Sequence, residues 1–355
     1  MTTFFALSGY VIALNYSGMD WRNRPINSFL RFFSYRVARL VPAFLAFSIV
    51  ILWSDGRFNR GDWIAANGTY LISHFAMADT WFPLLVDGQI VMGGPFNITW
   101  SISTEMFLYL AFALGAIAYG RCRGRGRSSA LFGVVSVIAA GMLYAAWHRA
   151  GRYYVGHGWT AESYYLDWLL YSSPYYRIFE FLAGVAAFRL SESFGVRQSA
   201  ILPRLSYLGL SLCLVGYWLR LYHFDYTHPL SMSVTFLAGL FFLLSACRPK
   251  NAFNRWLGSW LPAQIGTVSY SLYLFHSLTP EFAIRAAPPW LHLPAMPLFI
   301  VELATMIFVA TLLAAGAYRI IELPGRRAIR RTADSLLLRG RQAESAMASQ
   351  TTMGR

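Results

Sequence analysis

Long apolar stretches, separated by short arginine-rich segments, constrain this chain more than any other feature. Of its 355 residues, 56% are hydrophobic and only 13% are charged, whereas about a quarter of the residues of a soluble domain are charged. A helix needs roughly 20 predominantly apolar residues to cross a bilayer, because each residue advances the helix by about 1.5 Å. The sequence therefore predicts an all-α polytopic membrane protein.

By this length criterion we expect about nine transmembrane helices, the first of them at residues 4–16. The eight others are expected at residues 40–53, 98–120, 130–147, 172–190, 205–222, 229–247, 266–285 and 297–321. The segment at residues 40–53 is short for a span, so we expect it to extend back to residue 32. The connection at residues 54–97 is the longest, and it has room for a short helix on or in the membrane.

The basic residues predict how the chain is oriented. The chain contains 30 Lys and Arg residues against 16 Asp and Glu residues, a formal net charge of +14. When the connections are assigned alternately to two sides, most basic residues fall on the side that holds the C-terminus, and cytoplasmic loops are the ones that retain positive charge. We therefore expect a membrane domain at residues 1–325 and a basic, disordered cytoplasmic tail at residues 326–355.

Charge and cysteine patterns argue against two other classes of protein. The basic residues occur in short runs beside apolar segments and not on one amphipathic face, so the positive charge does not indicate nucleic-acid binding. Cys122, Cys213 and Cys247 lie within or next to apolar segments and lack CxxC or Cys/His spacing. We therefore predict neither a metal site nor a disulfide framework.

Ionisable side chains inside predicted spans are candidate functional residues, because they are costly in a bilayer unless they have a partner or a task. In TWSISTEMFLYL, Ser101, Glu105 and Tyr109 recur at intervals of four and share one helix face. In RIFEFLAGVAAF, Arg177 and Glu180 are three residues apart and can pair along one helix. Each set has a functional interpretation as part of a substrate cavity and a structural one as a packing contact.

Two further stretches carry polar residues at helical spacing. IGTVSYSLYLFHSL places Ser269, Tyr273 and His276 on one stripe, although a lone His at a helix end is more often a hydrogen-bonded group than a catalyst. YRVARLVP places Arg36 and Arg39 on one face, where the cytoplasmic side meets the membrane. Two guanidinium groups suit phosphate oxygens through bidentate hydrogen bonds, and anchoring to anionic lipid headgroups is the alternative.

Six stretches resemble, in content and in order, the motifs of one family. They are FFALSGYVI, FFSYRVARLVP, TWSISTEMFLYL, RIFEFLAGVAAF, SYSLYLFH and YRIIELPGRR. The family is the acyltransferase-3 family of integral membrane acyltransferases, and the resemblance extends from Phe4 to about Arg327. It implies a ten-helix fold and the transfer of an acyl group, commonly acetyl from a coenzyme A thioester, to a hydroxyl of a cell-surface or secreted carbohydrate.

The resemblance also implies partners and a location. The donor substrate would be acyl-CoA, with acetyl-CoA expected and a succinyl donor as an alternative, and no cofactor would be bound permanently. The acceptor would be a carbohydrate of the exopolysaccharide, Nod-factor or related glycoside type. The protein would span the bacterial cytoplasmic (inner) membrane several times, with the lipid bilayer and polysaccharide-assembly proteins as its partners.

The matched motifs carry implied roles for single residues. Arg36 and Arg39 become candidates for binding the phosphates of the donor, and Glu105 and His276 are the candidate catalytic residues. The other residues that the resemblance places along the substrate cavity are Ser8, Trp100, Ser101, Tyr109, Arg177, Glu180, Tyr273 and Glu322.

One expected feature of the family has no counterpart in this sequence. The family resemblance implies a catalytic His in a first helix, about three turns after an Arg, and neither stands before FFALSGYVI. We therefore expect an in-frame upstream extension of about 40 residues, the length of one span and its flanks. Residues 4–16 would then form the second helix of ten. A catalytically inactive, truncated acyltransferase is the alternative.

Two functions of other classes are also compatible with the sequence. Polar residues within apolar helices fit a transporter or flippase for a glycan or lipid-linked sugar, in which Glu105 and the Arg177/Glu180 pair would form a proton pathway. The sequence shows no inverted repeat, which argues against this interpretation. A structural partner of a polysaccharide synthase is the third interpretation, and it predicts normal polymer acylation after Glu105→Gln.

Overall fold

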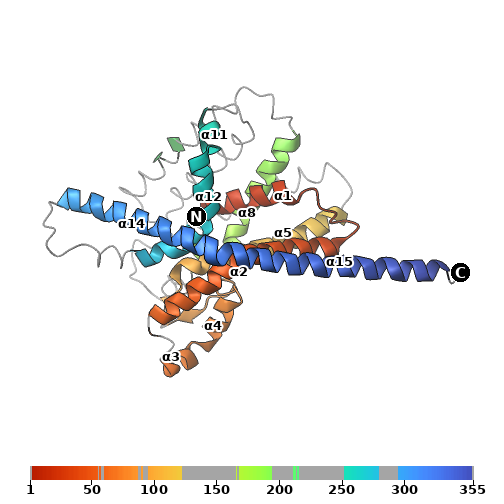
Figure 1. The fold of residues 1–355 in the computed structure, drawn as a ribbon, viewed down its shortest axis with the longest axis horizontal. Helices are drawn as coiled ribbons and strands as arrows, with labels where there is room; N and C mark the ends of the chain where they lie inside the picture. The colour runs from red at the N-terminus through yellow and green to blue at the C-terminus, as the bar shows by residue number, and fades with distance from the viewer. Residues whose placement is uncertain are drawn as a thin grey trace. The chain divides into compact units, whose positions relative to one another are not determined.

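The computed structural model divides the chain into two compact units. The described residues are 2–54, 56, 60–86, 89–90, 95–121, 165, 168–193, 211–212, 214–215, 252–279 and 295–353. Unit 1 comprises Met1–Arg22 and Ala65–Ser259, and unit 2 comprises Asn23–Ile64 and Trp260–Arg355. Helices dominate the described residues of both units, and Figure 1 colours them along the chain.

The described part of unit 1 is built around three apolar helices. They are α1 (Thr2–Tyr16), α5 (Trp100–Arg121) and α8 (Pro174–Ser193), and α8 packs against both α1 and α5. The shorter elements of this unit are α4 (Gly68–Phe75), β1 (Leu85–Val86), β2 (Gln89–Ile90), η3 (Asn97–Thr99), the π-helical turn η4 (Trp168–Ser172) and α11 (Ala252–Leu257). β1 and β2 form one antiparallel pair.

Two glycines allow α1 and α8 to cross in close contact. A Cβ atom on Gly9 would overlap the carbonyl oxygen of Phe181, and a Cβ atom on Gly184 would overlap that of Ala6. Small residues at such positions let helix backbones approach each other closely in a membrane. This crossing fixes where the side chains of α1 stand relative to those of α8.

Unit 2 is formed by long helices. They are α2 (Pro25–Ser54), α12 (Trp260–Phe275), α14 (Ala295–Ala317) and α15 (Leu323–Met353). The single turn η6 (His276–Leu278) follows α12, and the π-helical turn η7 (Tyr318–Glu322) joins α14 to α15. α15 packs against α2, and α12 packs against α14; Figure 1 shows α15 as the long blue helix that runs to the C-terminus. The short helix α3 (Gly61–Ala66) lies where the sequence passes from unit 2 to unit 1.

Prolines shape the helices of both units. Pro25 is the first residue of α2 and Pro174 is the first residue of α8. At this position the missing proline N–H would have no helical partner in any case.

Pro42 lies inside α2. A Cβ atom on Gly325 would come within 2.7 Å of the Pro42 ring. The start of α15 is therefore held against the middle of α2.

The described helices agree with an all-α membrane protein. Among the described residues, three helices are long and apolar enough to cross a membrane, and Thr3–Tyr16 is a shorter apolar helix. The three are Pro25–Ser54, Asn97–Tyr119 and Ile300–Arg339. The number of spans and the side that holds the C-terminus stay predictions. The spans expected at residues 130–147 and 229–247, and most of the span expected at 205–222, lie outside the described residues.

Helix bounds differ from the sequence prediction at several points. α2 begins at Pro25, earlier than the expected residue 32, because a count of apolar residues does not register its arginine-bearing first turns. α3 and α4 confirm a short helix in the connection at residues 54–97. α15 is helical up to Met353, so the expected disorder of residues 326–355 is wrong. Its Ala, Leu and Arg residues favour helix, and α2 supplies a packing partner.

Candidate functional site

A buried carboxylate is the centre of the first polar cluster, which lies in unit 1. Glu105 of α5 is only 6% exposed, and Ser101, one turn earlier, is 2% exposed. The Ser8 hydroxyl of α1 donates a hydrogen bond to Glu105 Oε1 at 2.9 Å, and the Tyr109 hydroxyl donates to the same oxygen. Two donors on one oxygen fix the orientation of the carboxylate. No described side chain donates to the other oxygen, Oε2.

The second cluster of unit 1 surrounds Arg177 of α8, whose side chain is fully buried. Arg177 Nη1 donates to Glu180 Oε1 at 2.6 Å, which is the pair that the sequence spacing predicts. Arg177 Nε donates to the carbonyl oxygen of Tyr171 at 2.6 Å. Arg177 Nη2 and Glu180 Oε2 are buried and have no hydrogen-bond partner among the described residues. The pair therefore keeps one donor atom and one acceptor atom for another group.

Aromatic rings enclose the Arg177 guanidinium. Its Cζ atom lies 5.2–5.9 Å from the ring centroids of Phe5, Trp100, Tyr171 and Tyr176. These distances are within the range of cation–π attraction. Phe5 stands one turn before Ser8 on α1, and its ring centroid is 6.2 Å from that of Trp100 on α5. The Glu105 and Arg177 clusters are therefore neighbours within unit 1.

A third polar cluster lies in unit 2, at the end of the π-helical turn η7. Glu322 is 2% exposed, and Ser271 Oγ of α12 donates to Glu322 Oε2 at 2.5 Å. Arg39 of α2 and Arg326 of α15 lie within electrostatic range of this carboxylate. Ser269, the serine of the predicted stripe, is exposed and donates within its own helix. The serine that contacts a candidate residue is thus Ser271, on another face of α12.

The other predicted residues of unit 2 lie on α2 and around η6. Arg36 is 7% exposed, and its Cζ atom is 5.9 Å from the ring centroid of Phe32. His276 is exposed, and its Nδ1 lies 2.6 Å from the carbonyl oxygen of Tyr273. Because a carbonyl oxygen only accepts hydrogen bonds, Nδ1 is the donor in this contact.

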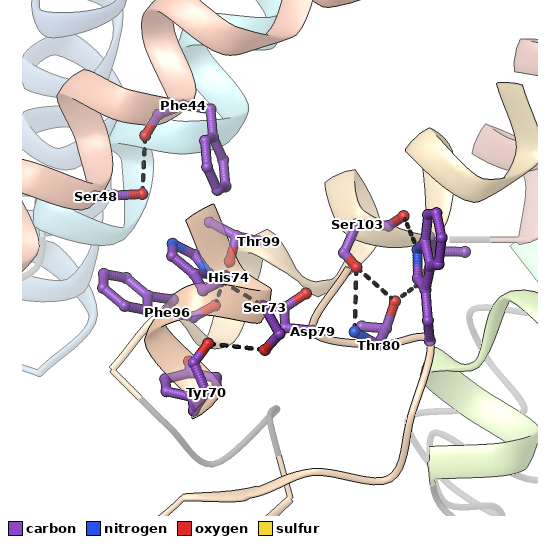
Figure 2. A network of polar contacts seen from close by, with 12 residues as sticks. Phe44, Ser48, Tyr70, Ser73, His74, Asp79, Thr80, Phe96, Thr99 and Ser103 are labelled. Carbon is purple, nitrogen blue, oxygen red and sulfur yellow. Dashed lines mark hydrogen bonds and ion pairs between the residues drawn. The ribbon is translucent and has the colours of Figure 1, made fainter. Parts of the chain in front are cut away.

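Sequence reasoning missed a buried network in unit 1 that Figure 2 shows. His74 of α4 and Asp79 are 0% and 1% exposed, with 3.1 Å between His74 Nδ1 and Asp79 Oδ2. The His74 ring stacks on the Phe96 ring, with centroids 3.7 Å apart. Met77, in the turn between the pair, has a φ of 55°, a left-handed conformation that is uncommon outside glycine. The spacing of His74 and Asp79 carries no helical or strand signal, so no pattern marks this pair.

The same network connects the turn after α4 to the helix that carries Glu105 (Figure 2). The backbone N–H and the hydroxyl of Thr80 both donate to Ser103 Oγ, at 3.1 and 2.9 Å. The hydroxyls of Thr80 and Thr104 are 3.1 Å apart, and Thr104 Oγ1 donates to the carbonyl oxygen of Ser172 at 2.6 Å. Ser103 therefore connects α5 to the turn after α4, and Thr104 connects α5 to η4, the turn that leads into α8.

Comparison with known proteins identifies the class of this membrane protein. The sequence model of the acyltransferase-3 family, described as an acyltransferase domain, matches residues 1–319. The chain therefore belongs to the acyltransferase-3 family, as the resemblance of its motifs indicates.

Relatives of the chain include the O-acetyltransferase OatA of Staphylococcus aureus, in strains NCTC 8325 / PS 47, COL and MRSA252. Each is 25% identical to this chain over 337 residues, which cover 92% of this chain and 52% of the relative. The chain thus spans about half the length of the curated relatives it matches. No solved structure matches the chain.

Proposed function

We propose that this chain is a membrane O-acyltransferase that transfers an acetyl group from acetyl-CoA to a hydroxyl of a cell-surface or secreted carbohydrate. Family membership supports acyl transfer, and relatives named O-acetyltransferases support acetyl as the transferred group. The observation that carries the proposal is the buried Glu105 carboxylate. Two hydroxyl groups donate to one of its oxygens and leave the other oxygen for an acceptor.

Acyl transfer from a thioester to a hydroxyl needs a base that removes the hydroxyl proton as the oxygen attacks the carbonyl carbon. Ser8 and Tyr109 donate hydrogen bonds to Glu105 Oε1. We therefore propose that Glu105 Oε2 takes the proton of the acceptor hydroxyl. The acceptor oxygen forms the new ester bond, the carbon–sulfur bond breaks, and coenzyme A leaves as a thiolate that regains a proton. His276, which is exposed and contacts the carbonyl oxygen of Tyr273 through Nδ1, is the second candidate base.

Donor and acceptor need separate binding groups. We assign the phosphates of the donor to Arg36 and Arg39, because guanidinium groups bind phosphate oxygens by paired, charge-assisted hydrogen bonds. In unit 1, Arg177 Nη2 and Glu180 Oε2 offer a donor and an acceptor atom for a sugar hydroxyl. The remaining proposed cavity residues are Ser8, Trp100, Ser101, Tyr109, Tyr273 and Glu322.

The proposed setting is the bacterial cytoplasmic (inner) membrane, which the chain would span several times with a cytoplasmic C-terminus. The uneven distribution of Lys and Arg supports this orientation, because cytoplasmic loops retain positive charge. The donor would then enter from the cytoplasm. The proposed partners are acyl-CoA, a carbohydrate acceptor, the lipid bilayer and polysaccharide-assembly proteins, and we propose no permanently bound cofactor.

Replacement of the base tests this function. The full-length protein in lipid nanodiscs is given labelled acetyl-CoA and a panel of oligosaccharides, and released coenzyme A and labelled sugar are measured. Glu105→Gln is expected to lower kcat by about 100-fold or more, the usual size of general-base catalysis, with the KM for acetyl-CoA little changed. Glu302→Gln is the matched control, because Glu302 is a half-buried carboxylate of α14 outside the three clusters.

Each possible result tests one part of the proposal. If Glu105→Gln keeps the wild-type kcat, Glu105 is not the base. If no acceptor yields labelled sugar, the proposed activity is wrong. Acetyl-CoA should raise the Tm of the wild-type protein but not of the Arg36→Gln/Arg39→Gln variant, because a ligand stabilises the state that binds it. Movement of an unmodified glycan into proteoliposomes, without acylation, would instead support the transporter.

A further inference from the structure

Arginine side chains from two helices gather where α15 packs against α2 in unit 2. Arg326 of α15 lies within electrostatic range of Arg330 on the same helix and of Arg39 on α2. All three side chains are half-buried. Among the described carboxylates, Glu322 lies within electrostatic range of Arg326. Partly buried like charges repel each other more strongly than charges in water do, so this arrangement favours the binding of an anion.

The described residues do not neutralise these arginines directly. No described carboxylate forms an ion pair with Arg39, Arg326 or Arg330, although such pairs exist at His74 and Arg177. The Nε atom of Arg330 is buried and has no hydrogen-bond partner among the described residues. The site therefore offers a buried N–H donor, on Arg330, for a group that the described residues do not supply.

Tyr35 of α2 holds one of these arginines in place. Arg330 Cζ lies 4.6 Å from the centroid of the Tyr35 ring, and Arg31 Cζ lies 5.7 Å from the same centroid. The Tyr35 hydroxyl donates to both oxygens of Asp334, at 2.9 and 3.2 Å. Asp334 thus anchors the ring through its hydroxyl. Arg330 rests on the ring face by cation–π attraction, which leaves its N–H groups available.

We propose that Arg39, Arg326 and Arg330 form a binding site for a phosphate group. A phosphate or pyrophosphate has enough oxygen atoms to accept charge-assisted hydrogen bonds from several guanidinium groups at once, and Arg is suited to such bidentate contacts. The close approach of Gly325 to Pro42 brings the α15 arginines to α2. Arg326 and Arg330 stand in the sequence as part of a basic tail, and only the packing of α15 gives them this role.

Two ligands share this chemistry, the phosphates of coenzyme A and the headgroup of an anionic phospholipid. If the ligand is coenzyme A, the site extends the donor site to α15, and the inference rests on the proposed function. If the ligand is a phospholipid, the phosphate site does not depend on the proposed function. The experiment therefore measures both ligands separately.

The first arm measures the Kd of coenzyme A by isothermal titration calorimetry, with full-length protein in phosphatidylcholine nanodiscs. Arg326→Gln and Arg330→Gln are each expected to weaken binding about tenfold, the order expected for losing a hydrogen bond to a charged group. Arg331→Gln, an exposed arginine of the same helix, is the control and should keep the wild-type Kd. The second arm counts phosphatidylglycerol molecules retained by each variant in native mass spectrometry.

The outcomes separate the two ligands. Weaker coenzyme A binding with unchanged lipid retention supports the donor, whereas lost phosphatidylglycerol with unchanged coenzyme A binding supports the phosphate site and removes its link to the donor. If neither measurement changes in Arg326→Gln or Arg330→Gln, the proposal is wrong.

A third arm uses the wild-type protein and so does not depend on whether a variant folds. Phenylglyoxal modifies accessible arginines, and inorganic pyrophosphate should protect Arg326 and Arg330 but not Arg331, as mapped by peptide mass spectrometry. Equal modification of all three with and without pyrophosphate overturns the site. Protection in a protein that does not bind coenzyme A would keep the phosphate site and reject the proposed donor.

Discussion

At the scale of single residues, the buried polar groups of unit 1 differ in how fully their hydrogen bonds are satisfied. Glu105 Oε1 receives two hydroxyl donors, whereas Arg177 Nη2 and Glu180 Oε2 receive no partner from the described residues. A buried polar atom without a partner costs about 1–3 kcal/mol. A ligand that bonds to Arg177 and Glu180 would recover this energy, which is the reason for proposing the pair as a contact for the acceptor sugar.

Removing one of the two hydroxyl groups that donate to Glu105 should slow the reaction without abolishing it. Tyr109→Phe and Ser8→Ala are each expected to lower kcat about tenfold, because each variant loses one hydrogen bond to a charged group. The double variant should depart from additivity, since both hydroxyls act on one oxygen. Steady-state kinetics check this, with Tyr119→Phe as the control because Tyr119 is 42% exposed on the same helix. Wild-type kcat in both single variants would contradict the proposed role.

Breaking the Arg177–Glu180 pair from one side should destabilise the protein. Arg177→Met leaves a buried carboxylate unpaired, and the free energy of unfolding should fall by about 3–5 kcal/mol. Arg177→Met/Glu180→Leu leaves no charge behind and should recover most of that stability. Thermal unfolding in nanodiscs measures both effects. If the double variant also recovers wild-type kcat, the pair serves packing and not the substrate.

At the scale of elements, π-helical turns stand next to two candidate residues. The turn η4 supplies the Tyr171 carbonyl that accepts a hydrogen bond from Arg177, and η7 ends at Glu322, which Ser271 contacts. A π-turn interrupts the regular α-helical pattern and is frequent at functional sites. In this chain the turns shift a carbonyl and a carboxylate into positions from which they meet side chains of other segments.

The crossing of α1 and α8 provides a test at this scale. Gly9→Ala should lower the free energy of unfolding by about 1–3 kcal/mol, the usual cost of overpacking, because the added Cβ overlaps the backbone of α8. It should also lower kcat, since Ser8 of α1 would move relative to Glu105. Gly115→Ala on α5 is the control, because nothing lies within 4 Å of its Cβ position. Equal Tm values for the two variants would refute the close crossing.

At the scale of the whole molecule, arginine has two tasks in this interpretation. The uneven distribution of Lys and Arg predicts the orientation of the chain, because cytoplasmic loops retain positive charge, and some of the same residues form the proposed phosphate site. The donor role of this site requires α15 to lie on the cytoplasmic side, where coenzyme A is available. The orientation of the chain is therefore a condition for the proposed function.

Reporter fusions after Arg355 test this orientation in a bacterial host. Green fluorescent protein should fluoresce there and alkaline phosphatase should be inactive, because the first matures in the cytoplasm and the second requires export. A fusion after Asn23, in the connection between α1 and α2, is the internal control, since the same side is predicted for both positions. Active phosphatase after Arg355 would place α15 outside and would exclude the donor role of Arg326 and Arg330.

The helical membrane class, the family and the side-chain contacts at regular helical spacing could be predicted from the sequence alone. Apolar length predicts helices directly, because the bilayer thickness sets how many residues a span needs. The Arg177–Glu180 pair was predictable for a similar reason, since three residues along a helix bring side chains to one face. The disorder predicted from composition at residues 326–355 was wrong, because charge density alone does not show that α2 offers α15 a packing surface.

Which polar groups meet from distant parts of the chain depends on the tertiary structure. Ser8 and Glu105 are 97 residues apart, and Ser271 and Glu322 are 51 residues apart. Their hydrogen bonds depend on how α1, α5 and α8 pack, and on how α12 lies against η7. No spacing rule reaches over such distances, because sequence periodicity describes one element at a time while a site is made where several elements pack together.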